Sequence, residues 1–267
     1  RLRNLLEDER YMNHPSPLLL ALGRDVTGKP IYADLARMPH LLIAGATGTG
    51  KSVCIHSIIT SFLFRNYPDL VKFIIVDPKR VELSDYNNIP HLLTPVITDK
   101  NKAIGALQWA VREMEKRYQI LSEHGTRDIA SYNDAVSRFD DGEIMPYIII
   151  VIDELADLIM ASPREVEGSI VRIAQMARAV GMHLIVSTQR PSVEVITGLI
   201  KANIVTRIAF QVASQVDSRT ILDMAGAEKL LGNGDMLYVS PEYMKPKRIQ
   251  AAFLMEKEVK KVIGYLK

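Results

Sequence analysis

Gly45-Ala46-Thr47-Gly48-Thr49-Gly50-Lys51-Ser52 is the stretch of sequence that decides the fold, because it matches G-x-x-x-x-G-K-[ST] without a mismatch. In this pattern glycines let the backbone wrap around phosphate oxygens, with N–H groups pointing inward at a helix N-terminus. We expect Lys51 to reach the β- and γ-phosphates and the Ser52 hydroxyl to ligate Mg²⁺. The sequence therefore predicts a nucleoside-triphosphate site formed by Gly45, Ala46, Thr47, Gly48, Thr49, Gly50, Lys51, Ser52 and Val53.

The flanking residues supply the context that such a loop needs. Residues 40–44 are apolar enough for a buried strand, and apolar positions recur at helical spacing over 51–64. Further strands are predicted at 71–76, 147–152, 183–187 and 206–211, with helices over 99–124 and 166–180 among them. This alternation predicts an α/β fold with a mainly parallel sheet and helices on both faces.

The two ends of the chain have different patterns. Residues 24–32 alternate through Gly28 and predict a hairpin with its turn at Thr27-Gly28. Near the C-terminus we expect a helix over 221–231, strands over 236–239 and 248–253, and a helix over 256–266. We divide the chain into a short β-rich N-terminal remnant or linker, residues 1–35, and one domain, residues 36–267.

Two acids follow the strand at 147–152. Beside a phosphate loop, Asp153 can hold the water shell of Mg²⁺, and Glu154 can polarise an attacking water. A hydrophobic strand ending in Asp-Glu is common, so this pattern alone leaves a structural role equally open. Together with the glycine loop it favours hydrolysis over transfer to a second small substrate.

Polar residues end two other predicted strands at the same edge. Gln189 is our candidate sensor of the γ-phosphate, with Thr188 as a support, because ligands bind at the carboxyl ends of parallel strands. Lys79 follows the strand at 71–76, and the sequence leaves open whether it faces the site or is a surface charge.

Composition excludes several classes of protein. The 267 residues are 48% hydrophobic, and one cysteine, Cys54, excludes a disulfide framework and a cysteine-based zinc site. No apolar run approaches the ~20 residues of a transmembrane helix. The net charge of +2 neither indicates nor excludes a nucleic-acid partner. Cys54 and Trp109 are expected in the core, and His40, His56, His91 and His183 are expected to be structural. Because the chain starts at Arg1, we expect it to be a segment of a longer protein.

Longer strings make the chain resemble one family, the FtsK/SpoIIIE DNA translocases, whose motor domain it is similar to over roughly residues 12–265. The strings are residues 40–52, 147–157, 174–184, 187–193, 196–203, 217–222, 226–232 and 234–238. The resemblance is strongest to the SpoIIIE-like type.

The resemblance implies a RecA-like ATPase that assembles as a hexameric ring around double-stranded DNA. Such a motor hydrolyses ATP with Mg²⁺ and pumps chromosomal DNA during cell division or sporulation. A neighbouring subunit usually supplies an arginine to the site; Arg178 matches that position, and Arg207 is the second choice. The resemblance also implies an N-terminal region, outside this chain, that anchors the protein in the bacterial cell membrane with the motor on the cytoplasmic face.

A ring pore needs only a few positive charges per subunit, because each neutralised phosphate releases counterions. Arg190, Lys201 and Arg219 are the candidate DNA contacts, although an ordinary solvated charge is as good an explanation for each. Two other functions stay open at this point. One is a related ring ATPase that moves protein, as in type VII secretion, and the other is an oligomeric scaffold gated by nucleotide.

Overall fold

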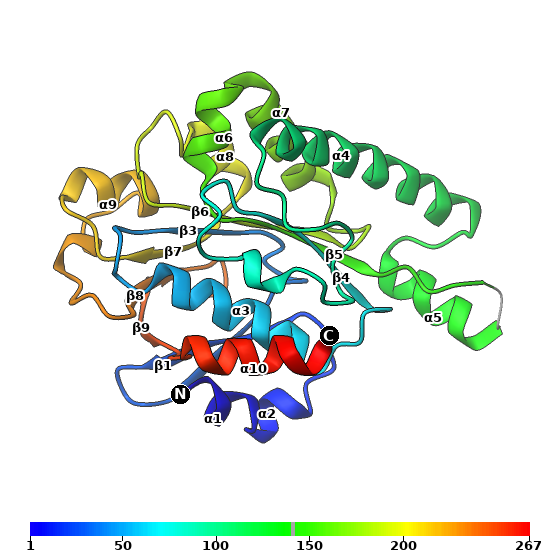
Figure 1. Cartoon of the computed structure of the whole chain (residues 1–267), viewed down its shortest axis with the longest axis horizontal. Coiled ribbons are helices and arrows are strands. Elements are labelled where there is room, and N and C mark those ends of the chain that lie inside the picture. The colour runs from blue at the N-terminus through cyan, green and yellow to red at the C-terminus, as the bar shows by residue number, and fades with distance from the viewer. Residues whose placement is uncertain (140–141) are drawn as a thin grey trace.

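The computed structural model describes residues 1–139 and 142–267. Within them, nine strands form one sheet in the order β2-β1-β9-β8-β7-β3-β6-β5-β4, and helices cover both of its faces (Figure 1). The strands are β1 (Leu19–Asp25), β2 (Pro30–Asp34), β3 (Leu41–Ala44), β4 (Val71–Val76), β5 (Tyr147–Ile152), β6 (Met182–Thr188), β7 (Thr206–Phe210), β8 (Asp235–Val239) and β9 (Lys247–Ala251).

The centre of the sheet is parallel and one flank is antiparallel. Strands β4, β5, β6, β3 and β7 pair in parallel, in that spatial order. Strands β8, β9, β1 and β2 continue from β7 in antiparallel pairs. The predicted mainly parallel sheet flanked by helices is therefore confirmed. All five parallel strands end at one edge of the sheet, where ligands bind in folds of this type.

The helices are α1 (Leu2–Leu6), α2 (Glu9–Met12), α3 (Lys51–Arg65), α4 (Lys100–Glu123), α5 (Ile129–Phe139), α6 (Leu155–Ala161), α7 (Pro163–Met176), α8 (Gly198–Asn203), α9 (Gln215–Leu222) and α10 (Glu256–Leu266), with short 3₁₀ turns η1 (Ser84–Tyr86) and η2 (Ala227–Lys229). Helix α3 buries Ile55, Ile58, Ile59 and Phe62 along one face, which fixes the helix that follows the glycine loop. Asp99 caps α4 by accepting a hydrogen bond from the Lys102 N–H at 2.9 Å.

The helix predicted over 221–231 is wrong. Helix α9 starts six residues earlier, where the Ser214 hydroxyl accepts from the Asp217 N–H and caps it. It ends at Leu222, and the next residue, Asp223, has a left-handed φ of +61°. The chain then passes Gly226 at φ +138° into η2, so one continuous helix is excluded. The prediction that Trp109 lies in the core is also wrong, because 37% of the residue's surface is exposed.

The N-terminal residues contain more helix than expected and belong to the main sheet. Helices α1 and α2 precede the predicted hairpin, which forms as β1 and β2. Strand β1 pairs with β9, so the hairpin extends the sheet at its antiparallel flank. The boundary at residue 35 stays a prediction. Among the described residues, no helix combines the length and the apolar composition needed to cross a bilayer.

Candidate nucleotide-binding site

The glycine loop connects β3 to α3, as predicted. Gly48 and Gly50 have φ of +78° and +115°, conformations that L side chains rarely adopt. A Cβ on Gly50 would lie 2.7 Å from the Gly234 nitrogen, and one on Gly45 would lie 2.6 Å from the Phe210 Cβ. The Thr49 hydroxyl donates to the Ala46 carbonyl at 2.7 Å and closes the turn. Packing against the ends of β7 and β8 therefore requires glycine at positions 45 and 50, whereas at position 48 the positive φ alone favours it.

Lys51 is buried at the start of α3 and points toward the acid that follows β5. Its ammonium lies 3.5 Å from Asp153 Oδ1 and 3.4 Å from the Ser187 hydroxyl. Burial raises the pKa of Asp153 above its usual range, the Lys51 charge opposes that shift, and Asp77 and Glu82 add to it. The carboxylate of Asp153 is therefore held in a dry site where a cation stabilises it.

Glu154, the candidate base, is 2% exposed and is held from three sides. It caps α6, because its Oε2 accepts from the Ala156 N–H at 3.3 Å. Its Oε1 accepts from the Gln189 N–H at 3.0 Å and lies 3.9 Å from the Lys79 ammonium. Strand β6 lies between β3 and β5, which explains why Gln189 can reach the acid pair.

Gln189 connects the base to the phosphate loop. Its Oε1 accepts from the Thr47 hydroxyl at 2.9 Å and from Lys79 at 3.5 Å. The structure therefore brings the candidate sensor, the candidate base and the glycine loop together. Thr188, the expected support of the sensor, contacts the residue after Gln189 instead: its hydroxyl accepts from the Arg190 N–H at 3.0 Å.

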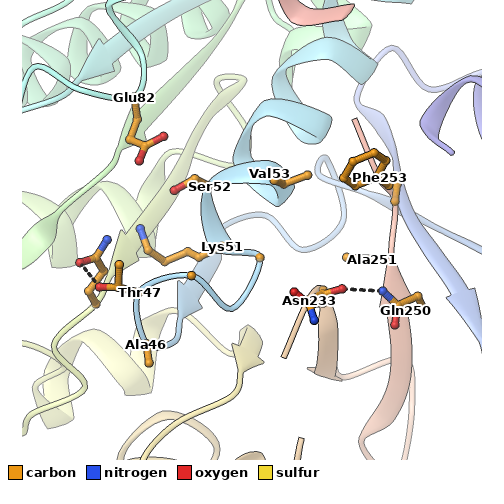
Figure 2. A pocket seen from close by; sticks show the side chains of 15 residues that line it. Ala46, Thr47, Lys51, Ser52, Val53, Glu82, Asn233, Gln250, Ala251 and Phe253 are labelled. Carbon is orange, nitrogen blue, oxygen red and sulfur yellow. Dashed lines mark hydrogen bonds between the residues drawn. The ribbon is translucent and has the colours of Figure 1, made fainter. Parts of the chain in front are cut away.

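A cavity of about 620 Å³ lies beside the loop and has a second wall that sequence reasoning missed (Figure 2). That wall consists of Glu82, Asn233, Gly234 and residues 250–253. The Gln250 amide donates to the Asn233 carbonyl at 2.8 Å, and Phe253 is 53% exposed. The only sequence signal for this wall is the Gly232-Asn233-Gly234 turn, because Glu82 comes from the loop after β4 and residues 250–253 come from β9 and the residues after it.

A loop after β4 places two charged side chains at the site. Asp77 is fully buried, and its Oδ2 accepts from the N–H groups of Glu82 and Leu83 at 3.1 and 2.9 Å. These bonds fold residues 77–83 back over the edge of the sheet. They place Lys79 beside Glu154 and Glu82 on the cavity wall.

The donors near the loop fit Mg²⁺, which prefers oxygen ligands. The Ser52 hydroxyl and the Glu82 carboxylate face each other across the cavity (Figure 2). Asp153 adds a buried carboxylate whose nearest cation is Lys51 at 3.5 Å. Ser52 and Asp153 therefore stay our candidate ligands, with Glu82 as a further oxygen donor.

The two candidate finger arginines lie in different surroundings. Arg178 is exposed just before β6, whose seven residues span about 20 Å before Gln189, so it cannot reach this subunit's own phosphate site. Arg207 is 7% exposed and donates to Asp223 Oδ2 at 2.8 Å and to the carbonyls of Lys201 and Ile204. The donors of Arg207 are used within the chain, which leaves Arg178 as the candidate.

The candidate DNA contacts also differ. Arg190 is exposed directly after Gln189, and its loop lines a 340 Å³ cavity together with the first residues of α9. Arg219 is exposed on α9. Lys201, in contrast, is paired with Asp223 at 2.5 Å, so a DNA contact would require breaking that pair.

A glycine loop between a buried strand and a helix, with an acid pair and a polar sensor at the same edge of a parallel sheet, defines a RecA-like P-loop ATPase fold. The chain belongs to the FtsK/SpoIIIE family, whose model matches residues 1–193.

Curated relatives extend the match over the whole chain. The chain is 57% identical to the DNA translocase FtsK of Caldanaerobacter subterraneus subsp. tengcongensis, over 100% of this chain and 37% of that protein. It is 55% identical to the DNA translocase SpoIIIE of Bacillus subtilis, over 99% of this chain and 34% of that protein. The chain therefore spans about a third of the length of these relatives.

Solved structures share the fold. The pCW3 conjugation coupling protein TcpA, in a monomer form with ATPγS, has a TM-score of 0.82 and 28% identity over 97% of this chain and 73% of its own. The cytoplasmic domain of the type VII secretion ATPase EccC from Thermomonospora curvata has a TM-score of 0.80 and 23% identity, over 100% of this chain and 32% of its own.

Proposed function

We propose that this chain is the motor segment of a DNA translocase that hydrolyses ATP to move double-stranded DNA. The observation that carries the proposal is the position of the dipeptide Gln189-Arg190. The Gln189 N–H contacts the candidate base Glu154 at 3.0 Å, and the next residue is the exposed Arg190. A nucleotide-dependent shift of one residue therefore changes the position of a positive charge at the surface. The DNA translocase names of relatives above 50% identity support the same function.

In this proposal each residue has one task. The backbone of residues 45–52 and the Lys51 ammonium bind the phosphates, and Glu154 accepts a proton from the attacking water. Gln189 orients the terminal phosphate against that water. Ser52 and Asp153 would hold Mg²⁺, which neutralises charge on the phosphate oxygens.

We propose that the chain assembles as a homohexameric ring around DNA, and the position of Arg178 supports an assembly in which subunits share a site. Because the length of β6, about 20 Å, separates this arginine from its own Gln189, we assign it to the site of a neighbouring subunit. We place the assembly at the cytoplasmic face of the bacterial cell membrane, anchored by a region outside this chain. We propose chromosome segregation during cell division or sporulation as its cellular role.

The decisive experiment measures ATP hydrolysis by the assembled protein with and without linear duplex DNA. We expect duplex DNA to stimulate hydrolysis, and Lys51→Ala and Glu154→Ala to abolish it. Lys51→Ala should also lose nucleotide binding, whereas Glu154→Ala should keep it. An assembled sample whose rate ignores duplex DNA would rule out the translocase and favour a protein-moving ring ATPase. Binding of ATP without any turnover would favour a nucleotide-gated scaffold.

A further inference from the structure

Lys79 lies in the loop after β4 and contacts two of the residues proposed to carry hydrolysis. We propose that Lys79 is a positioning residue of this site, which fixes the side chains of Glu154 and Gln189 relative to each other. The inference rests on the proposed ATPase function and deepens it. It concerns one residue that the glycine-loop and acid-pair motifs do not include.

The contacts form a closed group of three residues. The Lys79 ammonium lies 3.9 Å from Glu154 Oε1 and 3.5 Å from Gln189 Oε1, and the Gln189 N–H donates to the same Glu154 oxygen at 3.0 Å. Lys79 does not line the 620 Å³ cavity, whereas Gln189 does. The contacts of the ammonium are with Glu154 and Gln189, so we assign its effect on hydrolysis to the positions of these two side chains.

Charge explains why a cation is needed there. The Glu154 side chain is 2% exposed, and a buried carboxylate is stable only when it is hydrogen-bonded and paired. Its N–H donors, from Ala156 and Gln189, are neutral. Lys51 is directed to Asp153 instead, so among the residues that the structure describes Lys79 is the cation within 4 Å of Glu154.

The backbone holds Lys79 in place. The buried Asp77 accepts two backbone N–H bonds from Glu82 and Leu83, and the Arg80 N–H donates to the Asp77 carbonyl at 3.2 Å. Arg80 has a φ of +59°, a left-handed conformation that completes the turn. Lys79 is thus presented by a folded loop, although 42% of its side chain is exposed.

The test compares steady-state ATP hydrolysis and nucleotide affinity in the full chain for Lys79→Met, Lys79→Arg and the matched control Arg80→Met. Arg80 is the exposed neighbouring cation, so its loss removes the same charge from the same loop. In Lys79→Met we expect kcat to fall about tenfold or more, because the base is no longer oriented. Its KM and its affinity for a fluorescent ADP analogue should stay within about twofold.

Lys79→Arg should recover at least about a third of the wild-type kcat, because a guanidinium can bridge the same two oxygens. Arg80→Met should stay within about twofold of wild type. The proposal is overturned if Lys79→Met keeps more than half of kcat, if its ADP affinity falls along with its rate, or if Lys79→Arg is no better than Lys79→Met. If the wild-type protein hydrolyses ATP but ignores DNA, the translocase proposal fails while the Lys79 comparison is still decided on the DNA-independent rate.

Discussion

His183 is a buried base in the middle of the sheet, and its replacement by asparagine should remove part of the acid sensitivity of the fold. Its Nδ1 donates to the Pro39 carbonyl at 2.8 Å. Burial lowers the pKa of His183 from 6.5 to about 4; Arg178 and Arg117 lower it further, and the Pro39 bond and Asp34 oppose the shift. Asparagine can keep the N–H to Pro39 but does not titrate.

The sign follows from proton binding in the two states. Between pH 6.5 and 4 the unfolded chain protonates this imidazole while the folded chain does not. Stability therefore falls as the pH falls through this window. The full shift corresponds to about 3 kcal/mol, and the part developed between pH 7 and pH 5 to about 2 kcal/mol. His40, whose ring centroid lies 6.1 Å away and whose pKa burial lowers to about 3, adds a loss of the same sign in both proteins.

The assay is urea unfolding of wild type, His183→Asn and His124→Asn at pH 7 and pH 5. His124 is exposed at the end of α4, so His124→Asn serves as a control for the loss of a histidine. We expect wild type and the control to lose about 2 kcal/mol more than His183→Asn between the two pH values. Equal losses in all three proteins would refute the account of His183 as a buried neutral base.

Two further predictions concern the loop and the pair at Lys201. Gly50→Ala places a Cβ 2.7 Å from the Gly234 nitrogen at a φ of +115°, so nucleotide affinity should fall more than about tenfold. Titration with a fluorescent ATP analogue measures this affinity. An unchanged affinity would contradict the packing of the loop on β8. Asp223→Ala removes the partner of Lys201 and Arg207 and should cost about 0.5–1 kcal/mol at pH 7, since the carboxylate is 63% exposed. These two cations lower the pKa of Asp223 below 3.8, so the stability that Asp223 contributes is present above that pH and disappears as acid protonates the carboxyl. Urea unfolding of wild type and Asp223→Ala at pH 7 and pH 3 measures this loss. A difference in stability between the two proteins that stays constant with pH would exclude the ion-pair explanation.

The parts of the candidate site whose placement follows from the sequence are those built from neighbouring residues. Residues 45–52 form the loop because their conformation is set by the order of glycines within one turn. Asp153 and Glu154 reach the same edge because β5 is buried and parallel, a property visible in its uninterrupted apolar residues. Gln189 follows from the same argument applied to β6.

The parts that could not be predicted depend on pairing between distant segments. The wall at residues 250–253 reaches the loop because β9 pairs with β8 and β1, and nothing in the local pattern of β9 indicates those partners. The pairing of Lys201 with Asp223 depends on a left-handed residue at the end of α9 that has no glycine to mark it. The spacing of apolar residues predicts helix α9 too far along the chain, because the first turn of α9 is polar. The start of this helix is fixed instead by the Ser214 cap.

Strand β6 connects two sites in the proposed ring. Arg178 lies just before the first residue of β6, and Gln189 and Arg190 follow its last residue. In the proposed ring, this strand therefore separates Arg178, assigned to the neighbouring subunit's site, from Gln189 and Arg190, assigned to the site of the same subunit. All seven residues of β6 are buried between β3 and β5, so the strand is close-packed over its whole length. In the proposed ring, a displacement of Arg178 by the neighbour's nucleotide would reach Gln189 along β6, and Glu154 through the Gln189 N–H. In such a ring the near-neutral charge of the chain is an advantage, because few phosphate contacts per subunit allow DNA to be released in each cycle.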